Sequence, residues 1–506
     1  MSKELKRQNF EKYKVQILLG IPAILYFIVL HKFYAIDYYV PDNRAYFEMG
    51  QNGPIAVDGF SSLFILIATN IGACQKQLNY ICLSLIAIAL YNMSFFFQRF
   101  LKENKKTICA IIFLYSSGIW YYIYGKILYD FPFTAFTYSI CLLFAQRTYV
   151  KKRTKDVIYT AFFVGLLLSW KTYNVFSVFG FFLLIICNSD TRKTFIDICK
   201  KTINVIMAIL MLFVGYVAGN FTLLYKFKET ISGICAYPAS YNAKDFFFLK
   251  TRVIWDHVSD LPFNMSVCSM GVVVGILIIL PVICKKIQYA VVSIIMFLLL
   301  LVYVEKFSPG YAWHGFPFGL YVITAVCFII HEVNFYEKIY IKSILVLCLL
   351  TQIVNNFGVY LPKQVEWSCK TIYAEQVFED SESEILQKTS DIIASLGNET
   401  YYIDTAIKRY KPVALYENSR KKVTLYSRQG YYFLDPLEYV DYQGWTKLKT
   451  NENYSVEGEY VIWIVPNVFF TMGDVVDIHL YDGYEKIDFV SGKGYTIYLL
   501  QNKNQM

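Results

Sequence analysis

The 506-residue chain is poor in charge, proline and histidine: 17% of its residues are charged, and it has 13 prolines and 5 histidines. It contains no CxxC or HExxH spacing of the kind that holds a metal ion. We also find no internal repeat and no low-complexity segment. These absences count against a zinc protein and a repeat protein, and they leave no metal indicated by the sequence.

Hydrophobic residues make up 56% of the chain. Apolar runs of about 20 residues, the length that crosses about 30 Å of hydrocarbon, recur over the first seventy per cent of it. The first run, roughly 15–30, follows a basic segment but lacks a small-residue cleavage site, so we interpret it as a retained span. The composition predicts a polytopic α-helical membrane protein.

Lysine and arginine predict the orientation, because they concentrate in short cytoplasmic loops. The basic clusters precede the first span (Lys3 to Lys14) and recur at 99–106, 147–155, 192–201 and 285–286. All are expected inside, so the net charge of +9 indicates topology rather than binding to nucleic acid. Two short spans with a turn at 169–174 keep clusters 147–155 and 192–201 on one side. This gives about eleven spans, with the N-terminus inside and the C-terminus outside.

The composition changes after residue 361, which predicts a membrane domain over 1–361 and an extracytoplasmic α/β domain over 362–506. The second segment is long enough to bury its own core and has no glycine-rich phosphate loop. Its expected elements are an amphipathic helix near 375–396 and strands at 400–403, 422–426, 460–465 and 495–500. Most of the 12 cysteines lie in or beside hydrophobic runs, so a disulfide scaffold is not expected.

Two acids follow apolar spans on the expected outer side: Asp42 and Asp130. Each alone is most simply a solvated residue at a helix end. Further groups are expected on the same side: Lys171 within an apolar stretch, His314 before a late span, and Lys250 and Arg252 in a long loop. A tryptophan and two tyrosines at 120–122 are expected in an interfacial aromatic belt.

Such a set suits transfer of a group from a lipid-linked phosphate. A carboxylate could accept the proton of an attacking hydroxyl. Lysine, arginine or histidine could neutralise the charge that collects on the departing phosphate. The lipid of the donor would lie among the spans, which explains why a transferase would be embedded in the membrane.

The order of these residues resembles a family. Asp42 is followed four residues later by Tyr46, an Asp-x-Pro begins at Asp130, Lys171 follows the next spans, and Tyr-x-x-His-x-x-Pro covers 311–317. This is similar to the GT-C superfamily of membrane glycosyltransferases, specifically the bacterial relatives of dolichyl-phosphate-mannose protein mannosyltransferases and of the aminoarabinose lipid A transferase. The resemblance covers the membrane part, about residues 10–360, and more loosely the C-terminal segment.

The resemblance implies an inverting glycosyltransferase in a bacterial cell membrane, with a polyprenyl-phosphate sugar donor and a lipid, glycan or protein acceptor at the outer face. Asp42 would be the catalytic carboxylate and Asp130 the second acid. Donor phosphate binding would fall to Lys171 and His314, with Arg252 and Lys250 as alternatives to His314. Residues lining the substrate site would be Tyr46, Glu48 and Tyr311.

The chain departs from the family pattern at Asn43, where a second acid is common, and at 313–315, where an arginine is common. No cofactor is required; a divalent metal is compatible with the chemistry but not indicated. Two other functions remain open: a polysaccharide polymerase, which would carry arginine-rich external loops, and a transporter or flippase for lipid-linked sugars, which would show pseudo-symmetric halves.

Overall fold

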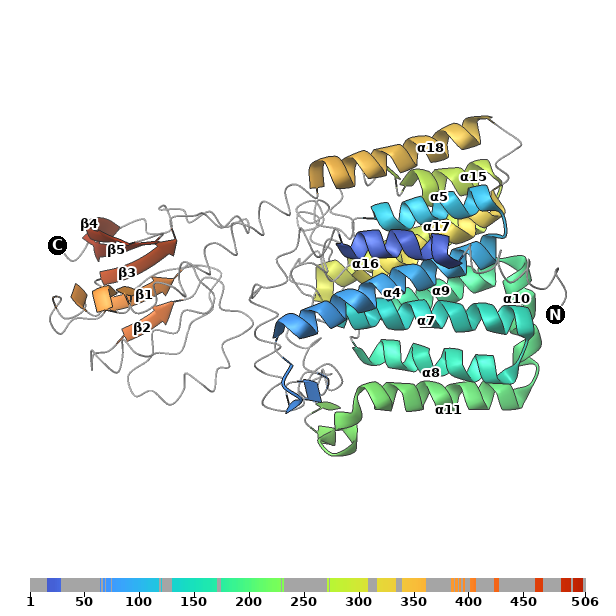
Figure 1. Ribbon diagram of the computed structural model, residues 1–506, viewed down its shortest axis with the longest axis horizontal. Coiled ribbons are helices and arrows are strands. Elements are labelled where there is room, and N and C mark those ends of the chain that lie inside the picture. The colour runs from blue at the N-terminus through green and yellow to red at the C-terminus, as the bar shows by residue number, and fades with distance from the viewer. Residues whose placement is uncertain are drawn as a thin grey trace. The chain divides into compact units, whose positions relative to one another are not determined.

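A computed structural model describes residues 16–28, 64–120, 130–231, 271–307, 316–333, 339–360, 384–395, 401–405, 423–426, 460–466 and 484–503, several of them with short gaps. The chain divides into two compact units, one of helices and one containing a β-sheet (Figure 1). The predicted boundary between residues 361 and 362 falls in a stretch outside the described residues, so it stays a prediction.

The helical unit begins with a helix over Gln16–Ile28. Its further elements are α4 (Gln75–Leu101), α5 (Asn104–Ser116), α7 (Asp130–Lys151), α8 (Thr154–Trp170), α9 (Val175–Cys187), α10 (Ser189–Cys199), α11 (Thr202–Gly219), η3 (Phe221–Leu224), the π-helical η5 (Gly275–Ile279), α15 (Leu280–Ile283), α16 (Ile287–Phe307), α17 (Phe316–Glu332), α18 (Ile339–Ile353) and the π-helical η7 (Val354–Tyr360).

Several of these helices could cross a membrane. Within the described part of the chain, three are long and apolar enough: 77–101, 202–219 and 339–358. Helices α9 and α10 add a fourth span if the pair, bent by 102°, is counted as one. The expected eleven spans are therefore not confirmed. Many aliphatic side chains on these helices, such as Ile206 and Leu347, are exposed, as expected for surfaces that face lipid.

The two helices predicted between the basic clusters 147–155 and 192–201 are present as α8 and α9. The structure adds α10, which follows α9 at a bend of 102°. The Asn188 side chain caps this helix by accepting a hydrogen bond from the Thr191 backbone N–H at 3.0 Å. A basic segment expected only as a loop is thus a short helix that leaves the direction of α9.

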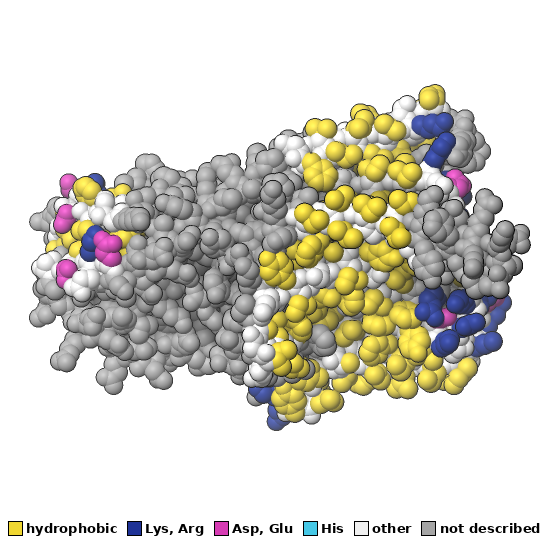
Figure 2. Space-filling model, in the orientation of Figure 1, with side chains coloured by type: hydrophobic (Ala, Val, Ile, Leu, Met, Phe, Trp, Pro, Cys, Tyr) yellow, Lys and Arg dark blue, Asp and Glu magenta, His cyan; other side chains and the backbone are white. Residues whose placement is uncertain are grey.

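The predicted cytoplasmic clusters at 99–106, 147–155, 192–201 and 285–286 lie at one end of the helical unit, here called the basic end. Lys106 donates a hydrogen bond to the His331 carbonyl at 3.0 Å, and Lys286 pairs with Glu332 at 2.5 Å. Arg147 lies 3.2 Å from the buried Asp156, which connects α7 to α8. Figure 2 shows Lys and Arg side chains gathered at this end, with hydrophobic side chains along the helices.

The core surrounds α17, whose residues are buried on every side from Phe316 to Ile330. A helix that is apolar all round needs neighbours all round, and α4, α5, α7, α9 and α16 supply them. Polar contacts also join helices within this core. The hydroxyls of Tyr138 on α7 and Thr324 on α17 are 2.7 Å apart, and those of Ser293 on α16 and Tyr321 on α17 are 3.3 Å apart.

Helices α8 and α11 pack closely because glycines remove side chains from their interface. A Cβ added to Gly165 would overlap the Leu212 carbonyl oxygen, and one added to Gly215 would overlap the Phe162 carbonyl oxygen. Gly215 and Gly219 form a G-x-x-x-G pattern, which lets two backbones approach in membrane helices. The two helices therefore form a tight pair beside α7 (Figure 1).

The second unit contains a five-stranded sheet in the order β2-β1-β3-β5-β4. Its strands are β1 (Tyr401–Thr405), β2 (Val423–Tyr426), β3 (Tyr460–Pro466), β4 (Tyr484–Ser491) and β5 (Tyr495–Asn502). β1 pairs in parallel with β2 and β3, and β5 pairs antiparallel with β3 and β4.

Four of these strands, β1, β2, β3 and β5, match the predicted positions. β4 was not predicted, because it is an edge strand whose residues 485–489 are exposed and include three charged side chains. Its pairing with β5 also shifts register between Lys486 and Asp488. Helical residues within 384–395 agree with part of the predicted helix.

Candidate functional site

The residues predicted to form the site fall almost entirely outside the described part of the chain. This holds for Asp42, Tyr46, Glu48, Lys171, Lys250, Arg252, Tyr311 and His314. For Asp130 the structure describes the backbone, which begins α7. The roles assigned to these residues stay predictions. Described residues lie next to Asp130 and Lys171 and two positions after His314, and they locate these three predicted segments.

The described neighbours of Asp130, Lys171 and His314 are aromatic residues that lie close together. Phe131, next to Asp130, has its ring centroid 5.1 Å from that of Phe316, which begins α17 two residues after His314. Phe133 stacks on Trp170, the residue before Lys171, at 5.1 Å and 22°. Three segments that are distant in the sequence thus meet at the start of α7.

We call this region the aromatic end; it comprises Phe64, Trp120, Phe131, Phe133, Trp170 and Phe316. Phe131 and Phe316 are fully buried, and Trp120 contacts Phe316 edge-on at 6.1 Å. The aromatic end lies at the opposite end of α7 from the basic cluster 147–155. The helices of the unit run back and forth between these two regions, so the basic end and the aromatic end are the two opposite ends of the helical unit (Figure 1).

Hydrogen bonds hold the end of α8 and the start of α9 against the first two turns of α7. The Asn174 Nδ2 donates to Thr134 Oγ1 at 3.2 Å and to the Leu167 carbonyl at 2.9 Å. The Trp170 Nε1 donates to Thr137 Oγ1 at 3.2 Å. All these side chains are buried, so water competes little for these hydrogen bonds, and they fix the position of α8 and α9 against α7. Both flanks of Lys171 are therefore tied to the helix that Asp130 begins.

A second set of polar side chains completes the end of α5. Gln352 donates to the Phe113 carbonyl at 3.2 Å, and Asn356, in the π-helix η7, donates to the Ser116 carbonyl at 2.5 Å. The Trp120 Nε1 donates to the Leu114 carbonyl at 2.7 Å. These donors satisfy carbonyls that a helix C-terminus leaves free. They hold α5, α18 and η7 together near Trp120.

Trp120 corrects one expectation. It was predicted to lie in an interfacial aromatic belt, yet its side chain is only 1% exposed. Its indole N–H finds a protein acceptor, which allows full burial. Sequence reasoning also missed Asn174, Gln352 and Asn356; the available signal was an uncharged amide inside an apolar run, where a polar side chain needs a partner.

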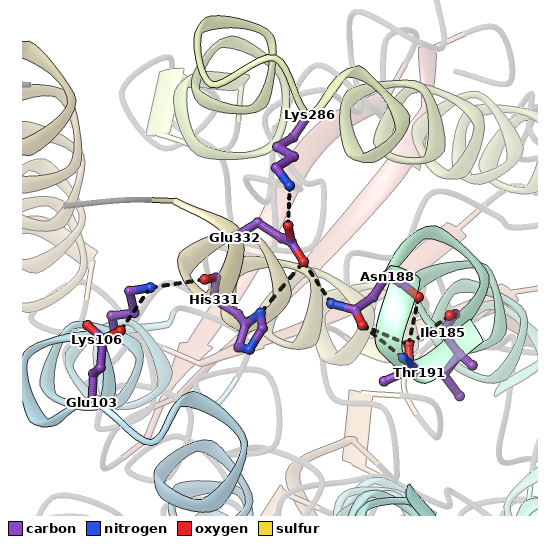
Figure 3. A network of polar contacts seen from close by, with 8 residues as sticks. All are labelled: Glu103, Lys106, Ile185, Asn188, Thr191, Lys286, His331 and Glu332. Carbon is purple, nitrogen blue, oxygen red and sulfur yellow. Dashed lines mark hydrogen bonds and ion pairs between the residues drawn. The ribbon is translucent and has the colours of Figure 1, made fainter. Parts of the chain in front are cut away.

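A separate polar network occupies the basic end (Figure 3). Glu332 accepts hydrogen bonds from Lys286 at 2.5 Å and from Asn188 at 2.8 Å, and His331 Nδ1 lies 3.6 Å from it. Lys106 is shared between Glu103 and the His331 carbonyl. The network joins α5, the bend between α9 and α10, the residue before α16, and α17. Its charges compensate one another, so we interpret it as structural support.

Among the described residues, no three His, Cys, Asp or Glu side chains come together as ligands for a metal ion. What the aromatic end offers is a rigid, buried frame that brings three chain segments with predicted acid and cation residues to one face. No protein-family model matches the chain, and no curated protein sequence is significantly similar to it.

Proposed function

We propose that this protein is a membrane glycosyltransferase that moves a sugar from a polyprenyl-phosphate donor to a lipid, glycan or protein acceptor at the outer face of the cell membrane. One observation carries the proposal. The segments that contain Asp130, Lys171 and His314 converge at the aromatic end, because their described neighbours Phe131, Trp170 and Phe316 lie in one buried cluster.

The placement of charge supports an outer-face site. Lysine and arginine favour the cytoplasmic side of membrane proteins, and the basic clusters lie at the end opposite the aromatic end. With the basic end in the cytoplasm, Asp130 begins α7 on the outer side. A donor anchored in the bilayer could then reach the site from between the helices, while the acceptor approaches from water.

In the proposed reaction the acceptor hydroxyl oxygen attacks the anomeric carbon, and the bond from that carbon to the phosphate oxygen breaks. The phosphate leaves with the bonding electron pair, and the hydroxyl proton passes to the carboxylate of Asp42. Attack opposite the leaving group inverts the anomeric carbon. Asp130 shapes the site, and Tyr46, Glu48 and Tyr311 line it.

Charge develops on the leaving phosphate, and fixed cations stabilise it. Lys171 supplies one, and His314, Arg252 or Lys250 supplies another. A monophosphate carries less charge than a diphosphate, so these side chains could suffice without a metal ion. No other cofactor enters the proposed reaction.

The test is sugar transfer from a radiolabelled polyprenyl-phosphate sugar pool in membranes containing equal amounts of wild type, Asp42→Asn or Asp197→Asn. Asp42→Asn keeps the shape and removes the base, so its rate should fall at least about 100-fold. The control, Asp197→Asn, changes an exposed acid at the basic end and should transfer at the wild-type rate. Equal rates for all three proteins would remove Asp42 from the mechanism.

If the wild type transfers no label from a broad donor pool, the flippase alternative is favoured, and movement of the labelled lipid across sealed vesicles is the measurement for it. A polymerase differs in its product, because it joins repeating units into chains of increasing length rather than adding one sugar to an acceptor. Sizing the labelled product separates these two.

A further inference from the structure

An apolar crevice of about 530 Å³ runs along the helical unit between α9 and the tight α8–α11 pair. Its volume is within the range of roughly 300–1,000 Å³ that small-molecule sites have. Its walls are almost entirely aliphatic and aromatic. Representative lining residues are Val164, Leu168, Phe179, Phe182, Ile209 and Leu212.

The crevice exists because α8 packs against α11 and α7, whereas α9 packs against α16 and α17. Several lining side chains, including Phe179, Phe182 and Ile209, are more than one third exposed. A crevice open to the side of a bilayer meets hydrocarbon rather than water. It would be filled by the chain of a lipid, since an empty space forfeits the dispersion contacts of its lining.

One end of the crevice is polar. Thr191 and Thr194 of α10 line it there, together with Asn204 of α11. The Asn204 residue is 5% exposed and therefore 95% buried. Its Nδ2 donates a hydrogen bond to the Ile198 carbonyl at 3.3 Å, but its Oδ1 has no hydrogen-bond partner. A buried acceptor without a donor is costly. A ligand that brings a hydroxyl group to this end would satisfy it.

The same end is strongly cationic. The helix ends around it carry nine Lys and Arg side chains against three carboxylates, namely Arg147, Lys151, Lys152, Arg153, Lys155, Arg192, Lys193, Lys200 and Lys201 against Asp156, Asp190 and Asp197. Asp156 and Asp197 are already paired with Arg147 and Lys200. Cations near a membrane surface attract anionic lipids.

Helix α10 is placed to connect the apolar and cationic parts. It is bent by 102° from α9, its Phe195 and Ile198 line the crevice, and its Arg192 and Lys193 are exposed. A helix with one apolar and one charged face lies in the plane of a membrane interface. It would therefore sit among lipid headgroups, with the crevice extending from it into the hydrocarbon.

We propose that the crevice binds one anionic glycerophospholipid of the leaflet at the basic end, with an acyl chain between α9 and α8–α11 and the headgroup beside α10. A hydroxyl of a glycerol headgroup would donate to Asn204 Oδ1, and Arg192 and Lys193 would lie near the phosphate. The site does not depend on the proposed glycosyltransferase function, because none of the residues assigned to that reaction lines the crevice.

The experiment titrates delipidated full-length protein in detergent with phosphatidylglycerol or phosphatidylcholine and counts bound lipids by native mass spectrometry. The first phosphatidylglycerol should bind at least about tenfold more tightly than the first phosphatidylcholine. Ala208→Trp, which fills the crevice, should abolish that first binding event. The matched control Ile206→Trp changes an exposed residue of α11 that does not line the crevice and should bind as wild type.

Two double variants, each of which removes two positive charges, test the headgroup site. Arg192→Gln/Lys193→Gln should weaken phosphatidylglycerol binding at least about tenfold and leave phosphatidylcholine unchanged. Lys226→Gln/Lys228→Gln, beyond the other end of α11, should change neither. Equal binding of the two lipids by the wild type, or equal binding by the two tryptophan variants, would overturn the proposal.

A measurement on the wild type covers the case in which Ala208→Trp does not fold. Phosphatidylglycerol with a photoactivatable group on its acyl chain is bound to the wild-type protein, irradiated, and located by peptide mass spectrometry. Adducts on α8, α9 and α11 support the site. Adducts confined to α16 and α18 contradict it.

Discussion

The rings of Phe131 and Phe316 lie 5.1 Å apart, although the two residues belong to helices that are remote in the sequence. Both are fully buried, so neither ring can move without its helix end. Phe131 follows Asp130, and Phe316 closely follows His314. This contact therefore fixes the spacing between two segments that carry predicted site residues.

Phe316→Ala should lower sugar transfer per folded molecule by at least about tenfold, because small displacements of reacting groups cost large factors in rate. The matched control is Phe328→Ala on the same helix, which is also buried but packs against Phe100 at the basic end. It should reduce thermal stability while leaving the rate per folded molecule near wild type. Equal rate losses in the two variants would mean that the aromatic end has no special role.

Glu332→Gln should destabilise the helical unit by about 1–3 kcal/mol, because it leaves the Lys286 ammonium without its carboxylate in a partly buried site. Thermal unfolding in one detergent measures the change. Asp197→Asn removes an exposed pair with Lys200 and should leave the unfolding temperature near that of the wild type, because solvent screens such pairs. If the network does not stabilise the helical unit, the two variants will show the same small change in unfolding temperature.

Gly215→Ala should separate α8 from α11 and lower the free energy of unfolding by about 1–3 kcal/mol, the usual cost of overpacking. The added methyl would overlap the Phe162 backbone carbonyl. Gly20→Ala is the control, since a Cβ there would lie 4.0 Å from the Tyr91 ring. Alanine favours a helix over glycine, so the control should be neutral or more stable; a similar loss in both would contradict the packing argument.

In the C-terminal unit, stability should fall in acid through Glu384. A hydrogen bond from Lys388, at 2.5 Å, lowers the pKa of the Glu384 carboxyl below its ordinary 4.5. A carboxyl with a lowered folded pKa stabilises the fold above its unfolded pKa, and this contribution is lost as the pH falls through the folded value. Hydrogen exchange of residues 384–395 should therefore accelerate below about pH 4.5.

Glu384→Gln should remove that acid dependence and exchange faster already at neutral pH. Glu485→Gln on the exposed strand β4 is the matched control and should exchange as wild type. The same acid dependence in wild type and Glu384→Gln would assign the effect to other carboxyl groups.

The sequence predicted most where one physical rule acts on a continuous segment. Lysine and arginine at both ends of 147–201 favoured two helices between them over one, and α8 and α9 are there. Strand-like runs located β1, β2, β3 and β5. By contrast, α10 was missed because its charge favoured a loop, and β4 because its side chains face solvent.

The frame of the candidate site could not be predicted in this way. Asn174 bonds to Thr134, and Gln352 to Phe113, across stretches that no local pattern connects. Which amide in an apolar run finds which partner depends on how the helices pack. The order of the motifs predicted that Asp130, Lys171 and His314 lie in one site. The structure describes the positions of their aromatic neighbours Phe131, Trp170 and Phe316, but not of these three side chains.

The length of α9 has a consequence for depth. Its 13 residues rise about 20 Å at about 1.5 Å per residue, whereas the hydrocarbon layer is about 30 Å thick. With α10 at the level of the headgroups, Asn174 stands about 10 Å short of the far surface. The start of α9 would then be recessed in the bilayer beside α7, whose 22 residues rise about 33 Å and reach the surface. A lipid-linked donor that enters at this recess would not need to lift its phosphate out of the membrane to react.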